Sequence, residues 1–264
     1  MPWLTLGACL VLVFGYLWQG WKLQHGGEYG AGELAWLGAN VPPLSLGSEP
    51  WRLALSVVMH NSVQHLLTNL FTLALIGTLL EGAAARWKWL SVFVGGGVFA
   101  AFGSAALNYD LTLDLPFSGV TQQIFVSTGA SGAIMSLAGA LAVAGFKRQL
   151  QTPVEGMHPL LRAGLVFGGL NVFLGLMHSG VDNSAHVMGL LFGALAGFGL
   201  FMAAGDHSLK GRLGAVIAAL AVVALIGAGL WTALPAAAKR EQLVRMAREL
   251  VIDARQEADG ARHP

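Results

Sequence analysis

The stretch STGASGAIMS, residues 127–136, places hydroxyls and glycines at the start of an apolar run of membrane length. Transmembrane helices use Gly, Ala and Ser where their backbones pack closely, so the stretch alone predicts a tightly packed span. A serine in such a run is more often a packing residue than a reactive one. Its meaning therefore depends on which other polar residues reach the same depth.

The composition of the 264-residue chain predicts a membrane protein. Apolar residues make up 55% of it and charged residues 11%, whereas soluble domains carry roughly 25% charged residues. A helical span needs about 20 mostly apolar residues. Seven runs meet this description: 3–18, 53–80, 87–107, 131–146, 161–177, 185–204 and 213–234. We read the first run as a true span rather than a cleaved signal peptide, and we expect an all-α polytopic membrane fold.

Charge and cysteine content exclude several kinds of partner and site. The net charge of +1 and the absence of a basic stripe give no support for nucleic-acid binding. Cys9 is the single cysteine, so the chain can form no internal disulfide and no cysteine-based metal site. No phosphate loop, paired-carboxylate site or zinc-binding histidine spacing is found. We therefore expect no metal and no cofactor.

The distribution of lysine and arginine predicts the orientation. With a cytoplasmic N-terminus, most of the loop cations lie inside, and the outer loops hold only Lys22 and Arg52. This topology places residues 236–264 outside, where we expect an amphipathic or flexible tail, solvated or lying in the interface. Because no organelle-targeting or lipidation signal is found, we predict a bacterial inner membrane.

Polar residues gather in the outer half of three runs. The second run carries His60, His65 and Asn69, the fourth carries Ser131 and the sixth carries His186. Polar groups are costly in hydrocarbon and tend to face a cavity or one another. Each has a structural explanation when taken alone. Together they supply a hydroxyl nucleophile, an imidazole base and donors for an oxyanion, which are the parts of acyl transfer.

Helical spacing supports this convergence. His65 and Asn69 are four residues apart and share a face, whereas His60 lies off that face and is expected to anchor the preceding loop. Small residues form two ridges that would let the fourth and sixth spans approach closely: Gly132, Ser136 and Ala140 on one, and His186, Gly189, Gly193 and Gly197 on the other. Such an approach is required for a direct hydrogen bond between Ser131 and His186.

The depth of the fourth run predicts water near its start. Ser131 and Lys147, the first inner charge, are 16 residues apart, which is roughly 24 Å of helix against a hydrocarbon core of about 30 Å. The loop before Ser131 must then enter the membrane, where irregular backbone is tolerated only inside protein or beside water. We expect a wet cavity there.

Several motifs in order resemble those of the rhomboid intramembrane serine proteases. They are GAN at residues 38–40, the pair Trp51 and Arg52, HNSVQHLLTN at 60–69, GASG at 129–132, and AHVMG at 185–189. The resemblance implies a catalytic dyad of Ser131 and His186, with His65, Asn69 and the Ser131 backbone N–H stabilising the oxyanion. It also implies cleavage of single-pass or other membrane-anchored proteins at or near their spans, with the active site open to the periplasmic or extracellular side.

The resemblance further implies a set of structural residues near the site: His60, Trp51, Arg52, Gly129, Gly132, Met135 and Gly189. Met135 stands where the family usually has an aromatic residue, and Met188 stands where it has Gly or Ala, so the meeting of the fourth and sixth spans is in question. Glu81 matches a glutamate that secures an inner turn. Asp182, four residues before His186, is a conceivable orienter of the imidazole, but we expect it to be a solvated loop residue.

The implied organisation is a rhomboid six-helix core over residues 1–205, an additional seventh helix at 206–235 and a tail at 236–264. The fifth span and the outer loop at 179–183 would form a lateral gate. One alternative is a catalytically weak or inactive rhomboid-fold protein that binds transmembrane segments. A seven-span transporter is a third hypothesis, but it requires polar residues continuing to the inner leaflet, and they stop in the outer half. The substrate and the oligomeric state are not encoded in any motif.

Overall fold

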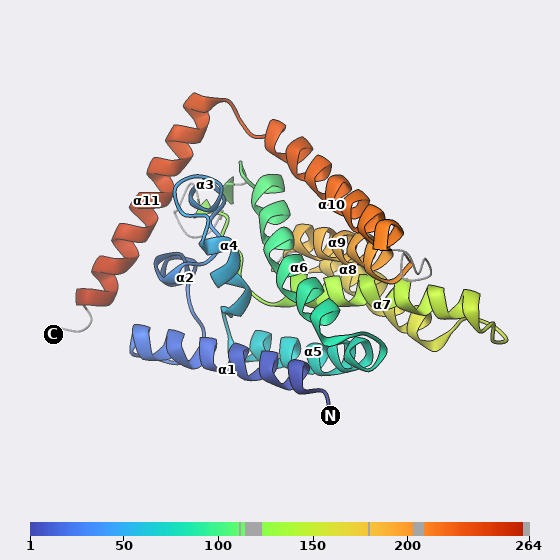
Figure 1. Ribbon diagram of the computed structural model, residues 1–264. Helices are drawn as coiled ribbons and strands as arrows, with labels where there is room; N and C mark the ends of the chain where they lie inside the picture. Colours follow the sequence, from blue (N-terminus) through green and yellow to red (C-terminus); the bar gives the residue numbers. More distant parts are fainter. Residues whose placement is uncertain (111, 114–122, 179, 203–208, 261–264) are drawn as a thin grey trace.

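The computed structural model describes residues 1–110, 112–113, 123–178, 180–202 and 209–260 (Figure 1). In this part of the chain the long helices are α1 (Trp3–Leu23), α5 (Val63–Ala83), α6 (Arg86–Leu107), α7 (Ser131–Gln151), α8 (Pro159–Met177), α9 (Asn183–Phe201), α10 (Leu209–Thr232) and α11 (Ala237–Gly260). Three short helices, α2 (Ala31–Leu37), α3 (Pro42–Ser45) and α4 (Arg52–Leu55), and the 3-10 turn Ser56–Val58 lie between α1 and α5. The strands β1 (Thr112–Leu113) and β2 (Gln123–Ile124) pair antiparallel.

Five of the described helices are long and apolar enough to cross a membrane, namely α1, α5, α6, α8 and α9. A sixth is added if Leu220–Thr232 and Ala237–Gly260, which meet at 91°, are counted as one broken span. Five of the seven predicted runs meet this criterion, and the run at 213–234 extends beyond the residues to which it was applied. The run at 131–146 fails it because α7 is rich in small residues and ends in Lys147, Arg148 and two glutamines.

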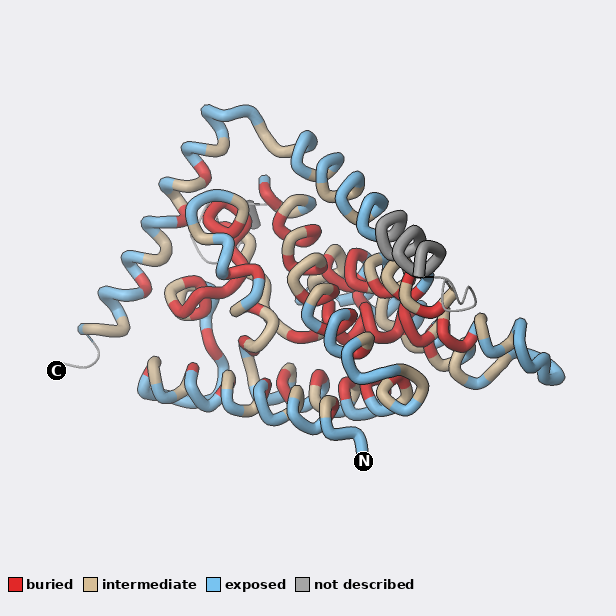
Figure 2. The backbone as a smooth tube through the Cα atoms, viewed as in Figure 1, coloured by how far each residue is buried: buried red, intermediate tan, exposed pale blue. Residues whose placement is uncertain are grey.

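Helix α7 is the centre of the bundle, and most of its residues between Gly132 and Ala144 are buried (Figure 2). It packs against α5, α6, α8 and α9. The two predicted small-residue ridges meet as expected, with Gly189 against Gly132, Gly193 against Ser136 and Gly197 against Ala140. A Cβ added at Gly193 would lie 1.9 Å from the Ser136 carbonyl oxygen. The backbones of α7 and α9 are therefore in direct contact.

Charged side chains hold the helix ends on the side opposite the predicted site. Lys88 at the start of α6 donates to the carbonyl oxygen of Leu200 at 2.5 Å, and Lys147 donates to that of Phe201 at 2.7 Å. Both bonds give carbonyl groups in the last turn of α9 a cationic side-chain donor. Glu81 near the end of α5 accepts the backbone N–H groups of Leu4 and Thr5, each at 2.9 Å, and so secures the first turn of α1.

The second span begins later than predicted. Residues 52–62 form α4, a 3-10 turn and a loop, and α5 starts at Val63, where Ser62 accepts the backbone N–H of His65 at 3.2 Å. His60 consequently lies in the loop and not in the span. Helix α5 begins after Ser62, although the apolar run starts earlier, because the Ser62 side chain accepts a backbone N–H that has no partner within the helix.

Helix α11 lies across the outer side of α2 and α3 (Figure 1). Its Ala247 belongs to a buried cluster with Ala35, Val41, Leu44 and Ile124. The tail forms the expected amphipathic helix, and its apolar stripe packs on protein while most of its other residues are exposed. The final residues 261–264 of the predicted tail lie outside the described residues, as do Ser179 of the predicted gate and the predicted core boundary at residue 205.

The backbone contact between α7 and α9 predicts a steric test. Gly193→Ala should destabilise the fold by at least about 2 kcal/mol, because the new methyl overlaps the Ser136 carbonyl and the helices must separate. Gly169→Ala in α8 is the matched control, since nothing lies within 4 Å of its added Cβ. Thermal unfolding in detergent should show a clear drop for the first variant and no drop for the second; equal midpoints would contradict the contact.

The docking of α11 predicts a cross-link. A Cβ added at Gly32 would lie 3.1 Å from the Cβ of Ala254, close to the separation of about 3.8 Å in a disulfide. In a Cys9→Ala background, the pair Gly32→Cys and Ala254→Cys should oxidise to one intramolecular disulfide, visible as a gel shift. Gly26→Cys paired with Ala254→Cys is the control, because the space around Gly26 is open. Equal cross-linking of both pairs would show that α11 is not docked.

Candidate active site

Ser131 is the first residue of α7, and a turn that requires glycine places it there. Gly129 has φ of +117°, a region that L side chains rarely adopt, and its N–H donates to the Ser56 carbonyl oxygen at 2.9 Å. A Cβ at Gly129 would lie 2.8 Å from Nε2 of His65 and 3.6 Å from Nδ2 of Asn69. The GASG turn therefore lies directly against the His65 and Asn69 side chains of α5.

The two polar residues of α5 are held by local hydrogen bonds. Nδ1 of His65 pairs with Oδ1 of Asn61 at 2.9 Å, and Nδ2 of Asn69 donates to the His65 carbonyl oxygen at 3.2 Å. An amide oxygen can only accept, so this pairing places the proton of a neutral His65 on Nδ1. The Asn69 amide has a second N–H that does not take part in this bond. That N–H can donate to an acceptor near Gly129.

His186 lies in the first turn of α9 and is 7% exposed. The neighbouring Ala185 carbonyl oxygen would lie 3.5 Å from a Cβ at Gly132, so the start of α9 meets the start of α7. His186 and His65 are close enough to interact electrostatically. The imidazole lies beside the backbone of Asn171, but its Nδ1 has no hydrogen-bond partner in the described part of the chain.

The structure thus brings Ser131, His65, Asn69 and His186 to one end of the bundle. The expected hydrogen bond between Ser131 and His186 is not formed among the described contacts. Catalytic hydrogen bonds are often long in unliganded enzymes and tighten only with substrate bound. Ser131 and His186 therefore lie at adjacent helix ends with no hydrogen bond between them among the described contacts.

His60 anchors the loop before α5 through its backbone. Its N–H donates to Gln19 and its carbonyl oxygen accepts from the same side chain, both at 3.0 Å. The ring packs edge-on against His65 with centroids 5.1 Å apart, and neither ring nitrogen has a partner among the described residues. Burial, with the neighbouring His65 ring, lowers the pKa of His60 to about 3. The ring is therefore neutral and adds no charge to the site.

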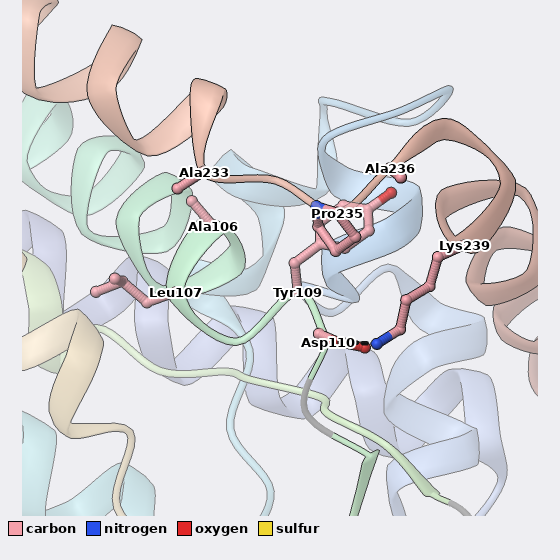
Figure 3. A pocket seen from close by; sticks show the side chains of 8 residues that line it. All are labelled: Ala106, Leu107, Tyr109, Asp110, Ala233, Pro235, Ala236 and Lys239. Atoms are coloured by element: carbon pink, nitrogen blue, oxygen red, sulfur yellow. Dashed lines mark hydrogen bonds and ion pairs between the residues drawn. The ribbon is translucent and has the colours of Figure 1, made fainter.

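The cavity beside Ser131 is small. It has a volume of about 20 Å³, which is room for one water molecule, and its polar lining is Ser56, Ser127, Thr128, Ser131 and Asp182. The predicted wet cavity is therefore present only as a narrow space. A hollow of about 420 Å³ lies elsewhere, where Tyr109 and Asp110 face Pro235 and Lys239 (Figure 3). It holds none of the predicted catalytic groups.

The predicted structural residues lie around this centre. Buried Arg52 donates to the carbonyl oxygens of Ala35 at 2.6 Å and Ala39 at 3.1 Å, and its guanidinium stacks on Trp51 with 4.9 Å to the ring centroid. A Cβ at Gly38 would lie 2.5 Å from the Trp51 ring. This pair therefore fixes the loop that carries Asn40, whose backbone pairs with Ser127 in both directions.

The two methionines that depart from the family pattern are accommodated. Met135 is buried inside α7, with 1% of its surface exposed. Met188 points at α6, where a Cβ at Gly103 would lie 2.5 Å from its Cγ. Its bulk is therefore taken up at Gly103 and leaves the contact of Gly189 with Gly132 intact. The glycines of the third run, at 95–97 and 103, did not predict this contact with Met188. The spacing of residues along one helix does not identify the side chain that packs against it from another helix.

Sequence reasoning missed the role of Asp182. It is half-buried, and its Oδ2 accepts the hydroxyls of Ser104 and Ser127, each at 2.5 Å. Its Oδ1 accepts the N–H of Ala185 at 3.0 Å and caps α9. The expectation of a solvated loop residue was wrong. The signal available was its position directly before a helix, where Asp is favoured as a cap.

Comparison with known proteins identifies the family of the chain. The Rhomboid domain family matches residues 47–203. Rhomboid protease AarA of Providencia stuartii is 32% identical over 166 residues, 60% of this chain and 58% of that protein. Rhomboid protease GluP of Bacillus subtilis is 27% identical over 209 residues, 78% of this chain and 37% of that protein. RHOMBOID-like protein 6, mitochondrial, of Arabidopsis thaliana is 31% identical over 159 residues, 59% of this chain and 45% of that protein.

The chain spans about half the length of the curated relatives that it matches. The family match covers more than half of the 264 residues and includes every predicted site residue from Trp51 to Gly189. Together with the five apolar helices and the buried α7, it shows that this multi-pass membrane protein belongs to the rhomboid family.

Proposed function

We propose that the protein is a serine-type intramembrane endopeptidase that hydrolyses peptide bonds in or beside transmembrane segments. The observation that carries this is the convergence of three helix starts. Gly129 lies against His65 and Asn69 of α5, and Gly132 lies against Ala185 and Gly189 of α9. These contacts support a site in which Ser131 is the nucleophile, the α5 side chains are oxyanion donors and His186 is the base.

The reaction follows from these groups. The Ser131 oxygen attacks the scissile carbonyl carbon while His186 takes the hydroxyl proton. The tetrahedral oxyanion is held by Asn69 and the backbone N–H of Ser131, and by His65 when its ring carries a second proton. His186 then gives its proton to the leaving amine, and an acyl-enzyme remains. Water enters from the outer side, loses a proton to His186 and attacks the acyl carbon; the bond to the Ser131 oxygen then breaks, and His186 returns the proton to that oxygen as the new carboxyl group leaves.

The hydrogen bond from His65 to Asn61 ranks the oxyanion donors. With Nδ1 protonated toward Asn61, Nε2 of neutral His65 carries a lone pair and cannot donate. His65 donates from Nε2 only as an imidazolium. Asn69 is therefore the side-chain donor that is available at every protonation state, and we expect it to contribute more than His65.

The size of the cavity bears on the substrate. A space for one water excludes a helix, so the substrate must present an extended backbone and the surrounding elements must move apart to admit it. We infer that substrates are membrane-anchored proteins whose spans have locally weak helicity. We further propose a bacterial inner membrane location, with the N-terminus cytoplasmic and the site open to the outside, because the lysines that cap α9 lie at the opposite end.

A rhomboid-fold binder of transmembrane segments is the second candidate. The open contact between Ser131 and His186 is the observation that favours it. Both residues are nevertheless present, and the glycines that keep their helices in contact are present as well. The organisation that we propose for either function keeps residues 1–205 as the core, 206–235 as an additional helix and 236–264 as the tail.

The dyad is tested with a serine-reactive fluorophosphonate probe on the purified protein in liposomes. The wild type should be labelled, and Ser131→Ala and His186→Ala should each abolish labelling and cleavage of a membrane-anchored substrate without lowering the unfolding temperature. Ser91→Ala is the matched control, because that hydroxyl is exposed and bonded only to the Trp87 carbonyl at 2.8 Å. Labelling that persists in Ser131→Ala, or a folded wild type that is not labelled, would refute the protease.

The donor ranking is tested at Asn69. Asn69→Ala should lower the cleavage rate by about 10²-fold, as loss of one oxyanion donor does in other serine enzymes. Thr68→Ala is the control on the same helix, because Thr68 makes a similar bond to the carbonyl four residues earlier but is exposed on the other face. Comparable rates for Asn69→Ala and Thr68→Ala would remove Asn69 from the mechanism.

A further inference from the structure

Asp182 joins three elements at the predicted site. Its Oδ2 accepts Ser104 from α6 and Ser127 from the segment before α7, each at 2.5 Å, and its Oδ1 accepts the N–H of Ala185 in α9. Hydrogen bonds to a carboxylate are shorter and stronger than those between neutral groups. Nδ1 of His186 has no hydrogen-bond partner in the described part of the chain, so Asp182 acts through these three donors and not by a hydrogen bond to the imidazole.

The contact between Ser127 and Asp182 links two segments that lead to predicted catalytic residues. Ser127 lies four residues before Ser131, and Asp182 lies four residues before His186. Their side-chain bond therefore ties the segment that delivers the nucleophile to the helix that delivers the base. Ser127 is fixed on its other side by the two backbone hydrogen bonds to Asn40, at 2.9 and 3.0 Å. The segment cannot shift without breaking this set of bonds.

We propose that Asp182 is a positioning residue that sets the separation of Ser131 and His186 through Ser127 and the first turn of α9. The inference rests on the proposed protease function. It goes beyond that function, because a dyad of Ser131 and His186 does not require any role for Asp182. The competing explanation is an ordinary helix cap, which would stabilise α9 without affecting the dyad. A displacement of about 1 Å between reacting groups costs on the order of 10²-fold in rate, so the two explanations differ measurably.

The experiment uses the full chain in detergent micelles and measures fluorophosphonate labelling against probe concentration. Asp182→Ala should lower the limiting labelling rate at least about 30-fold, with the half-saturating concentration unchanged because the probe site remains. Asp182→Asn should recover part of the rate, since its oxygen still caps α9 and its amide still bonds one hydroxyl. His158→Ala, which removes the side-chain cap of α8, is the matched control and should label like the wild type.

A double mutant tests the path through Ser127. Ser127→Ala should slow labelling by about tenfold, and adding it to Asp182→Ala should cause no further loss, because groups that act as one unit are not additive. Losses that multiply, or a folded Asp182→Ala protein that labels like His158→Ala, would overturn the proposal.

The positioning role is kept separate from the protease by a thiol measurement. In a Cys9→Ala background, Ser131→Cys reacts with a small methanethiosulfonate reagent without any catalytic step. Adding Asp182→Ala should change that rate at least about fivefold, even if the wild type never labels with fluorophosphonate. A failure to label in the wild type would refute the protease alone. An unchanged thiol rate in a protein that does label would refute the positioning role alone.

Discussion

The contact between the backbones of α7 and α9 is the constraint on which the site depends. Lipid tails are as apolar as leucine, so helices in a bilayer gain little from burial and associate through close packing. Glycines at 139, 189 and 193 provide that packing, because any side chain there would overlap the opposite backbone. The same contact sets how far Ser131 can lie from His186, so packing and chemistry share one geometric requirement.

A second requirement is that irregular backbone near the site must be satisfied inside the protein. The segment from Ile124 to Ala130 meets it through the bridge to Asn40 and the bond from Gly129 to Ser56. Asn40 in turn donates its side chain to the Ala101 carbonyl at 2.8 Å. The loop between α1 and α5 thus supports the segment that leads to Ser131.

Periodicity and composition were sufficient for the all-α membrane class, the two small-residue ridges and the convergence of three polar helix starts. Periodicity and composition did not predict which residues an individual side chain contacts. Ser62 ended an apparently continuous run by capping α5, Met188 found its space at Gly103 on a different helix, and Asp182 found two serines far away in sequence. Such choices depend on three-dimensional neighbours, and a hydropathy pattern carries no information about them.

Helix α11 closes the outer side of the loop that supports the site. Its Ala247 completes a buried cluster with Val41 and with Ile124, which begins the segment leading to Ser131. Residues 237–260 are made after every element that they cover. During synthesis the earlier helices are therefore made before α11. The apolar surface formed by Val41 and Ile124 stays uncovered until α11 has been synthesised. The order of translation thus separates assembly of the bundle from completion of the wall beside the segment that leads to Ser131.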